Sequence, residues 1–390
     1  MVSVANQPVL ELRGLAQTRE AHVYHEGGQF PVLTALPDDT IIGVLRGGAG
    51  HLGLAGRVEI VRSRDGGQSW TPSAVVADSD RDDRNPALGV SQRGTVILAY
   101  HRTGNYDAAG RWTPEEFAAR GERPVEVMIT RSHDGGLTWE RPYPLGVPII
   151  ETGSPYGKIV SLPDGTLLLA IYGPIHAELL GARAEGLAAN TLCSYVLRSR
   201  DDGLTWTDTA AVGVGFNETG LLALPDGAVL ALLRGDVPND SLSVARSTDG
   251  GQTWTEPTQL TDTRQHPADL VALHDGSILL AYGNRNPPYR VEGRISRDGG
   301  QSWLPTVIAF SGHLYGYNVV APRPNDLGYP STVVLRDGRA VTLYYYTPSL
   351  RERGKDRYDL SSSFYSAKDY RAIAVTWRED ELLAALAADS

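Results

Sequence analysis

The chain has 390 residues, a formal net charge of −10 at pH 7 and a single cysteine, Cys193, which excludes an internal disulfide. The negative charge argues against nucleic acid as the main partner, and no apolar run approaches the roughly 20 residues that span a bilayer, so no membrane partner is expected either. The N-terminus has neither the basic nor the apolar region of a signal peptide, which predicts a cytoplasmic protein.

The predicted elements begin with an apolar stretch, Val9 to Leu15, that has no hairpin partner of its own. After it, a short apolar run meets a turn of the Pro, Asp or Gly type six times, and a second apolar run follows each time. Each of these units predicts a β-hairpin. The turns lie at residues 36–39, 92–94, 162–165, 224–227, 273–276 and 335–338.

A second motif, S-x-D-(G/D)-G-x-(S/T)-W, follows the strand after each of the first five hairpins. A carboxylate that accepts backbone N–H bonds and glycines that adopt positive φ suit a tight turn, and the Trp is expected to anchor each repeat by packing. We therefore predict that the five Asp residues stabilise turns and take no part in catalysis. The motif occupies residues 63–70, 132–139, 199–206, 247–254 and 296–303.

Six units of four antiparallel strands predict an all-β fold, a six-bladed β-propeller that forms a single domain over residues 1–390. The sixth unit lacks the Asp motif, and its third strand, Ala372 to Arg378, runs into a predicted C-terminal helix at 379–388. A ring must close, and the lone strand at 9–15 is expected to supply the fourth strand of the last blade. This closure would leave no sheet edge in the ring.

Polar residues at the starts and ends of the inner strands are the candidate site residues, because these strand ends meet at one end of the channel. Arginines from several blades converge there, and a guanidinium group binds a carboxylate or phosphate bidentately, which indicates an acidic ligand. The structural alternative for Glu218 and Arg234 is an ion pair that seals the channel. The candidates are Gln29, Arg46, His51, Asp82, Asp83, Arg84, Tyr156, Lys158, His176, Glu218, Arg234, His266, Asp269, Arg285, Arg290, Asp326 and Tyr329.

The five Asp motifs resemble the Asp boxes of the sialidase (neuraminidase) superfamily of six-bladed propellers with BNR repeats, and the resemblance covers essentially the whole chain. Sialidases bind the substrate carboxylate with three arginines and use a Tyr nucleophile, an assisting Glu and an Asp acid/base. The resemblance implies that Tyr329 is the nucleophile and Glu218 its base. It also implies Arg234, with Arg290 or else Arg285, as carboxylate-binding arginines.

Two positions depart from the sialidase pattern. Gln29, two residues before Pro31, stands where the family has its first arginine. No Asp lies between Arg46 and Arg62, so either His51 or one of Asp82 and Asp83 is expected to protonate the leaving oxygen. For His51 the alternative is a histidine that bonds a backbone carbonyl of its glycine-rich loop. Gln29, Arg84 and Asp269 complete the expected substrate-binding set.

We therefore expect a sialidase-like exo-glycosidase that acts on a terminal acidic sugar of a glycan, without a cofactor or a metal. One alternative is a polysaccharide lyase or rhamnosidase-like propeller that uses His and Tyr on a uronic-acid linkage. Another is a glycan-binding propeller without catalysis. A lyase would give an unsaturated product that absorbs in the ultraviolet, and a binding protein would show saturable affinity without turnover. We make no prediction of oligomeric state.

Overall fold

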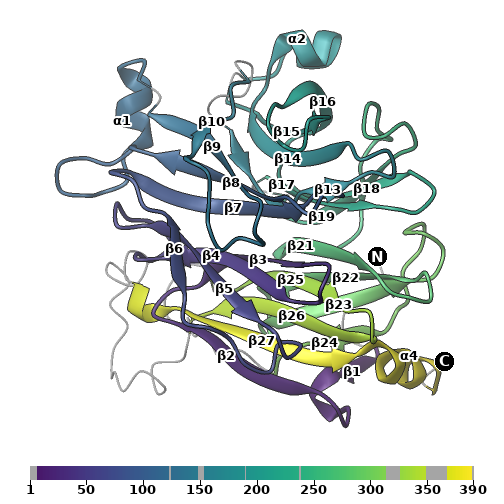
Figure 1. Cartoon of the computed structure of the whole chain (residues 1–390). Coiled ribbons are helices and arrows are strands. Elements are labelled where there is room, and N and C mark those ends of the chain that lie inside the picture. Colours follow the sequence, from purple (N-terminus) through teal and green to yellow (C-terminus); the bar gives the residue numbers. More distant parts are fainter. Residues whose placement is uncertain are drawn as a thin grey trace.

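Six antiparallel sheets surround a common axis in the computed structural model (Figure 1). The structure describes residues 7–122, 124–147, 153–188, 190–236, 239–312, 326–347 and 367–388. The innermost strands of successive blades pack against one another, and the first blade meets the sixth where Leu33 N–H donates to Ser331 Oγ at 2.9 Å. The predicted all-β six-bladed propeller is confirmed.

The first three blades, from the innermost strand outward, have the following bounds. Blade one consists of β3 (Gln29–Ala35), β4 (Ile41–Gly47), β5 (Arg57–Ser63) and β6 (Ala74–Ala77). Blade two consists of β7 (Asp82–Val90), β8 (Val96–Thr103), β9 (Val125–Ser132) and β10 (Tyr143–Pro144). Blade three consists of β11 (Ser154–Pro155) and β13 (Val160–Ser161), which both pair with β14 (Leu167–Pro174), and then β15 (Leu192–Ser199) and β16 (Thr207–Val214).

The last three blades follow the same order. Blade four consists of β17 (Phe216–Ala223), β18 (Val229–Gly235), β19 (Leu242–Ser247) and β20 (Thr258–Gln259). Blade five consists of β21 (Gln265–Ala272), β22 (Ile278–Asn284), β23 (Arg290–Ser296) and β24 (Val307–Ala309). Blade six consists of β25 (Gly328–Val334), β26 (Arg339–Tyr346), β27 (Arg371–Arg378) and β2 (Arg19–His25).

Helices and two extra strands, β1 (Val9–Glu11) and β12, lie between and beside the blades. The strand β12 (Gly157–Lys158) pairs in parallel with β7, so the chain crosses from blade three to blade two and back. None of the helices in the described ranges is both long and apolar enough to cross a membrane. The helices are η2 (Leu12–Gly14), α1 (Pro114–Ala119), α2 (Ala177–Leu180), η4 (Gly181–Ala184), η5 (Ala367–Asp369) and α4 (Glu379–Ala388).

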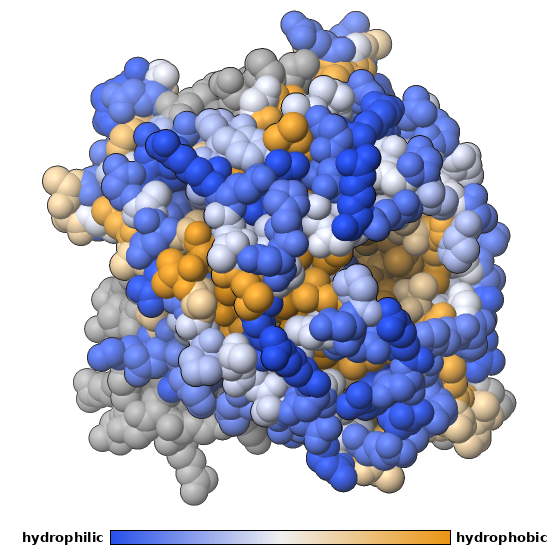
Figure 2. All heavy atoms as spheres, in the orientation of Figure 1, coloured by the Kyte–Doolittle hydropathy of each residue, from blue (hydrophilic) through white to orange (hydrophobic). Residues whose placement is uncertain are grey.

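The apolar core lies between the blades and is densest at their inner and middle strands. Every residue of β4 is buried, whereas β6 at the outer edge of the same blade is exposed at Ala74 and Val75. The predicted hairpin turns form as expected: at the third, Gly165 N–H donates to Leu162 O at 2.9 Å, with Gly165 at φ 86°. Figure 2 shows hydrophilic side chains over most of one face, with hydrophobic ones across its middle, where the face is hollowed.

The Asp boxes are turns that also join neighbouring blades. In the first box, Asp65 Oδ1 accepts from Ser69 N–H at 3.0 Å, and the Trp70 indole donates to Gly67 O at 3.1 Å. An arginine of the preceding blade donates to a backbone carbonyl of each box, which stabilises the ring blade by blade. These arginines are Arg339, Arg62, Arg131, Arg198 and Arg246, in the order of the boxes.

The N-terminal segment closes the ring, but the strand predicted at 9–15 was the wrong one. The strand β1 (Val9–Glu11) pairs in parallel with β24, at the outer edge of blade five. The strand that pairs with β27 is β2, and Figure 1 shows the two side by side. An outermost strand buries little, so β2 has few apolar residues and gave no signal in the sequence, whereas Leu12 is apolar because η2 packs against the core.

Candidate active site

The innermost strands of five blades start with a β-bulge at the same end of the channel. The pairing register shifts between Gln29 and Val32, Arg84 and Ala87, Phe216 and Thr219, Gln265 and Ala268, and Gly328 and Ser331. A bulge adds a residue on one strand and turns a side chain in a new direction, and bulges are frequent next to active sites. The repeated bulge therefore presents one side chain per blade to the mouth of the channel.

Two of these bulges hold an aromatic residue in a strained backbone conformation. Phe30 has φ 54° and Tyr329 has φ 50°, and each precedes a proline. Positive φ is rare for a bulky side chain and costs of the order of 1–3 kcal/mol, so the surrounding structure must hold it in place. The two rings meet at a centroid distance of 4.9 Å, and both are nearly fully buried. Strain of this kind concentrates at functional sites.

Tyr329, Glu218 and Arg234 form one hydrogen-bonded group at this end of the channel. The Tyr329 hydroxyl donates to Glu218 Oε1 at 2.6 Å, and Arg234 Nη1 lies 2.6 Å from Glu218 Oε2. Arg234 Nη1 also lies 3.4 Å from the Tyr329 oxygen. The three residues come from β25, β17 and β18, so the ring brings blades four and six together at this point.

The electrostatics of this group keep the Tyr329 phenol protonated at rest. Burial, and then the Glu218 carboxylate beside it, raise the pKa of Tyr329 well above its usual value. A phenol with such a pKa becomes a nucleophile only when a base takes its proton during attack. Among the described residues, Glu218 Oε1 is the acceptor of that proton.

Further arginines surround Tyr329, and some of their donors lack an acceptor. The Arg285 guanidinium carbon lies 5.8 Å from the centre of the Tyr329 ring, and that of Arg84 lies 5.5 Å from the Phe30 ring. Among the described residues, no acceptor is within hydrogen-bond distance of the buried atoms Arg234 Nε and Arg285 Nη2, and Arg285 Nη2 forms only a long ion pair with Asp326 at 3.9 Å. A buried donor without a hydrogen bond costs about 1–3 kcal/mol, so these donors favour an anionic ligand that would accept from them.

The positive charges around the site also act on the nearby histidines. Burial, with the positive charge of Arg84 adding to it, lowers the pKa of His101 to about 3. Burial and the charges of Arg234 and Arg285 lower the pKa of His266 to about 3 as well, although Asp240 opposes this shift. Both rings are neutral near pH 7, so the arginines supply the positive charge of the site.

His51 also packs edge-on against Phe30, with its ring centroid 5.0 Å from the Phe30 ring. Its Nδ1 is 2.8 Å from Asp326 Oδ2, and the hydroxyls of Tyr345 and Tyr370 donate to the same carboxylate at 2.6 and 2.8 Å. Burial alone would raise the pKa of Asp326, but His51, Arg285 and the Tyr345 hydroxyl outweigh it and hold that pKa well below its usual range. Asp326 is therefore ionised.

An ionised Asp326 fixes the orientation and the tautomer of His51. Since a carboxylate only accepts, Nδ1 of His51 must carry the proton, and in the neutral ring Nε2 is then the basic nitrogen. Burial lowers the pKa of His51, and the nearby Asp326 only partly offsets this effect. The pair can therefore hold a ring that accepts and returns a proton at Nε2.

A family model described as the BNR repeat-like domain matches residues 48–342. The chain belongs to this family. A sialidase from Micromonospora viridifaciens is 27% identical over 233 residues, which are 58% of this chain and 35% of that protein. The chain therefore spans about a third of the length of this relative.

Two solved structures share the BNR propeller fold. A protein of unknown function from Dyadobacter fermentans has a TM-score of 0.70 and 21% identity, with 94% of this chain and 100% of that chain covered. A sialidase from Trypanosoma rangeli, solved in complex with 2,3-difluorosialic acid as a covalent intermediate, has a TM-score of 0.62 and 13% identity. That match covers 93% of this chain and 55% of the other. At these identities the likeness shows the fold.

Three residues predicted for the site of this BNR propeller bond elsewhere in the described structure. Asp83 accepts from Ser79 N–H at 2.6 Å, and burial raises its pKa to about 6. Asp269 is 2.7 Å from Lys158 Nζ and accepts from Thr332 N–H at 2.7 Å. Arg290 pairs with Glu292 at 2.7 Å and reaches Glu11 at 3.5 Å. Within the part of the chain that the structure describes, none of these three forms a hydrogen bond or an ion pair with Tyr329 or Glu218, so they do not enter the mechanism proposed below.

Gln29 occupies the position where the sialidase pattern has an arginine, and it is fully buried. Its Nε2 donates to Ala49 O at 3.5 Å, and within the described residues its Oε1 has no donor. The fully buried arginine of this blade is Arg46, which pairs with Asp82 and donates to Gly50 O at 2.8 Å. Arg46 therefore holds the loop that carries His51 and is not available to a ligand.

Sequence reasoning missed the groups that hold His51 and Tyr329 in place. Asp326 was noted only for its position before β25, and Phe30, Tyr345 and Tyr370 were not singled out. One signal was available: Phe30-Pro31, Asn85-Pro86, His266-Pro267 and Tyr329-Pro330 repeat an X-Pro pair at the start of an inner strand. This repeat marks four of the five bulges; the fifth, between Phe216 and Thr219, has Glu218 in the place of the proline.

Proposed function

We propose that this BNR propeller is a sialidase-like exo-glycosidase that releases a terminal acidic sugar, sialic acid or a related one, from a glycan. The observation that carries the proposal is the 2.6 Å hydrogen bond from the Tyr329 hydroxyl to Glu218, within a cluster of buried arginines. A carboxylate at the anomeric carbon of the sugar would repel a carboxylate nucleophile, whereas a neutral phenol is not repelled. Tyrosine nucleophiles are the recognised sialidase exception among glycosidases.

Binding comes first. Arg234 and Arg285 would receive the sugar carboxylate, because each has a buried donor atom that no described residue accepts from. Arg84, on the Phe30 side of the site, would add a third positive charge in place of the arginine replaced by Gln29. Three guanidinium groups from blades two, four and five would then hold the anomeric carbon against Tyr329.

Bond exchange follows in two steps. Glu218 takes the phenol proton as the Tyr329 oxygen attacks the anomeric carbon, and a proton from His51 Nε2 goes to the leaving oxygen as the glycosidic bond breaks. In the second step His51 takes a proton from water, the water oxygen displaces Tyr329, and Glu218 returns its proton to the phenolate. Two displacements at one carbon retain its configuration.

The burial of His51 bears on the pH at which this mechanism operates. His51 must be protonated to donate, and burial lowers its pKa below the usual 6.5. Activity should therefore be highest at acidic pH and fall as pH rises through this lowered pKa. Asp326 would act as a positioning residue, because it fixes which nitrogen of His51 faces the substrate.

The test measures hydrolysis of sialyllactose by the wild type and by Tyr329→Phe, which removes one oxygen from the site. Since one positioned acid, base or nucleophile contributes a factor of at least about 10²–10⁴, kcat should fall by that much or more, with the fold unchanged by circular dichroism. His51→Asn should remove the basic limb of the pH profile of kcat/KM. A Tyr329→Phe variant with wild-type kcat would overturn the proposed nucleophile.

A second candidate is β-elimination from a uronic acid, as in polysaccharide lyases. It is favoured by one observation: Asp326 holds His51 as a neutral ring with a basic nitrogen, which suits abstraction of a carbon-bound proton. Incubation with polyuronate glycans distinguishes the two, because elimination gives an unsaturated product that absorbs in the ultraviolet and hydrolysis does not.

A further inference from the structure

The carboxylate of Asp326 is shared by groups from three blades. His51 Nδ1 lies 2.8 Å from its Oδ2, and the hydroxyls of Tyr345 and Tyr370 donate to its two oxygens at 2.6 and 2.8 Å. Arg285 of blade five approaches the other oxygen: its Nη2 lies 3.9 Å from Oδ1, which is too far for a hydrogen bond. Arg285 and His51 therefore attract one negative charge from different blades.

One end of the Arg285 side chain is fixed, and the other end is not. Its Nε donates to Leu327 O at 3.2 Å, and Arg264 donates to its backbone carbonyl at 2.8 Å. Its Nη2 is buried and, within the described ranges, has no hydrogen-bond acceptor. The guanidinium carbon lies 5.8 Å from the centre of the Tyr329 ring, so this cation is near both the candidate nucleophile and Asp326. An anion that binds Nη2 beside Tyr329 competes with Asp326 for Arg285.

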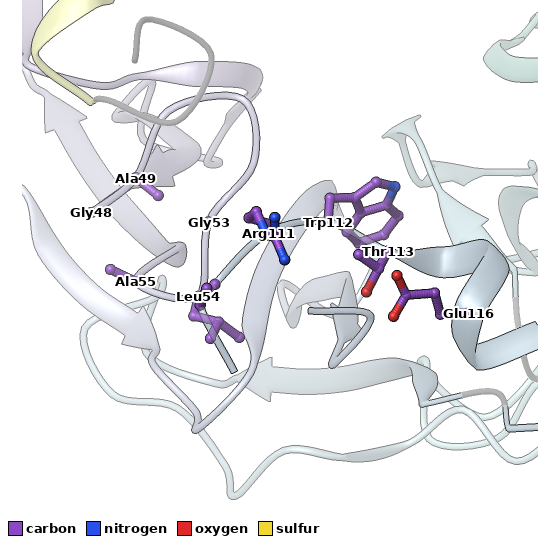
Figure 3. A pocket seen from close by; sticks show the side chains of 11 residues that line it. Gly48, Ala49, Gly53, Leu54, Ala55, Arg111, Trp112, Thr113 and Glu116 are labelled. Carbon is purple, nitrogen blue, oxygen red and sulfur yellow. The ribbon is translucent and has the colours of Figure 1, made fainter. Parts of the chain in front are cut away.

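The loop that carries His51 borders open space on one side. Residues 48–56 connect β4 to β5, and Figure 3 shows a cavity of about 790 Å³ that is lined on this side by Gly48, Ala49, Gly53, Leu54 and Ala55. His51 does not line the cavity. Its ring packs against Phe30 at 5.0 Å and pairs with Asp326. The orientation of His51 therefore depends on Asp326 as well as on the loop.

Positive charge surrounds the pair of His51 and Asp326. Burial lowers the pKa of His51, Arg84 and Arg46 lower it further, and Asp326 opposes them. Burial would raise the pKa of Asp326, and Arg285 is one of the groups that outweigh this effect. A carboxylate bound to Arg285 adds a negative charge beside the pair, and a nearby negative charge favours the protonated form of a histidine. Binding of an acid and protonation of His51 should therefore assist each other.

We propose that Arg285 links substrate binding to the protonation of the general acid. When the carboxylate of the terminal sugar accepts from Arg285 Nη2, the charge of Asp326 acts on His51 alone, and His51 Nε2 takes up a proton from the solvent. This proton is the one that passes to the leaving oxygen. The inference rests on the proposed function, because it explains how a histidine that is neutral in the free protein acts as an acid. Since linked equilibria are reciprocal, an acidic sugar must bind more tightly when His51 is protonated.

The first experiment follows the protonation of His51 in the free protein, so it needs neither a ligand nor turnover. The ring C–H signals of the histidines are titrated by NMR, and that of His51 is assigned with His51→Asn. Arg285→Gln removes a positive charge beside the pair and should raise the pKa of His51 by about one unit. Arg290→Gln is the matched control, because Arg290 is also in blade five but pairs with Glu292, and it should leave the titration unchanged.

The second experiment uses the wild type with an acidic sugar. Binding of N-acetylneuraminic acid is measured by isothermal titration calorimetry at pH values on both sides of the His51 titration. The dissociation constant should be about tenfold lower at the acidic end, and in His51→Asn it should change little with pH. With sialyllactose as substrate, the basic limb of kcat should lie about one pH unit above that of kcat/KM, because kcat reports the complex and kcat/KM the free protein.

The outcomes separate this inference from the proposed function. A pKa of His51 that Arg285→Gln leaves unchanged overturns the inference, even if sialyllactose is hydrolysed. It is also overturned if the wild type does not bind N-acetylneuraminic acid, or binds it with an affinity that does not vary with pH. A raised pKa in Arg285→Gln together with pH-dependent binding supports it, even if no sialoside is hydrolysed and the proposed function fails.

Discussion

Replacing Asp82 should destabilise the protein more than the loss of any surface ion pair. Arg46 and Asp82 form an ion pair in which both side chains are fully buried. Burial lowers the pKa of Arg46, and the Asp82 charge is the main effect that opposes this shift. Asp82→Ala leaves the guanidinium group buried without its counter-ion, and breaking a buried pair in this way costs about 3–5 kcal/mol.

The expected change in melting temperature follows from the size of the chain. The unfolding entropy is about 2.1 cal/mol/K per residue, or about 0.8 kcal/mol/K for 390 residues. A loss of about 3–5 kcal/mol therefore lowers Tm by about 4–6 °C. Activity should fall as well, because Arg46 holds the loop that carries His51.

The assay is thermal unfolding followed by circular dichroism, with two control variants. Glu122→Gln breaks an exposed pair with Arg120 near α1 and should leave Tm within about one degree of the wild type. The double variant Arg46→Met/Asp82→Leu removes both charges and should recover much of the lost stability. A Tm unchanged in Asp82→Ala, or a double variant no more stable than the single one, would refute the reasoning.

Further predictions concern ring closure, the Asp boxes and carboxylate binding. Deletion of residues 7–25 should lower Tm far more than deletion of 7–11, because β2 and not β1 pairs with β27. Burial would raise the pKa of Asp65, but hydrogen bonds led by those from Ser69 lower it to about 2. The Asp65 carboxylate therefore stabilises the fold fully above pH 4, and this stabilisation is lost as the pH falls towards 2. In Asp65→Asn, Tm should change less with pH between 4 and 2 than it does in the wild type. Arg234→Lys should raise KM about ten- to hundredfold, whereas Arg290→Lys should not, since Arg290 is paired with Glu292.

The fold could be predicted because its repeats are encoded locally. Each hairpin turn and each Asp box is a short run of residues whose backbone requirements are visible in the sequence, and five or six copies fix the architecture. The closing strand was assigned to the wrong residues because β2 is an outer strand with half-exposed side chains. Apolar patterning indicates burial, and an edge strand buries too little to be recognised.

The sequence predicts those candidate site residues whose proximity follows from their places on the inner strands of the blades. Glu218 at the start of β17 and Arg234 near the end of β18 meet because they are on paired strands, and Tyr329 lies in the equivalent bulge of β25, one position earlier than Glu218 in its own. Asp326 and His51 meet across blades six and one, and no local pattern relates them. Arg290 pairs with Glu292, two residues on and on the same face of β23, and the position of Arg290 before the fifth Asp box does not indicate this pairing.

The central claim, that Tyr329 is the nucleophile, is tested most directly by trapping the covalent intermediate. The protein is incubated with 2,3-difluorosialic acid, digested, and its peptides are analysed by mass spectrometry. The account predicts one added sugar on the peptide that contains Tyr329, fragment ions that place it on that residue, and no label in Tyr329→Phe. A label on any other residue, or turnover of sialosides without a label on Tyr329, would contradict it.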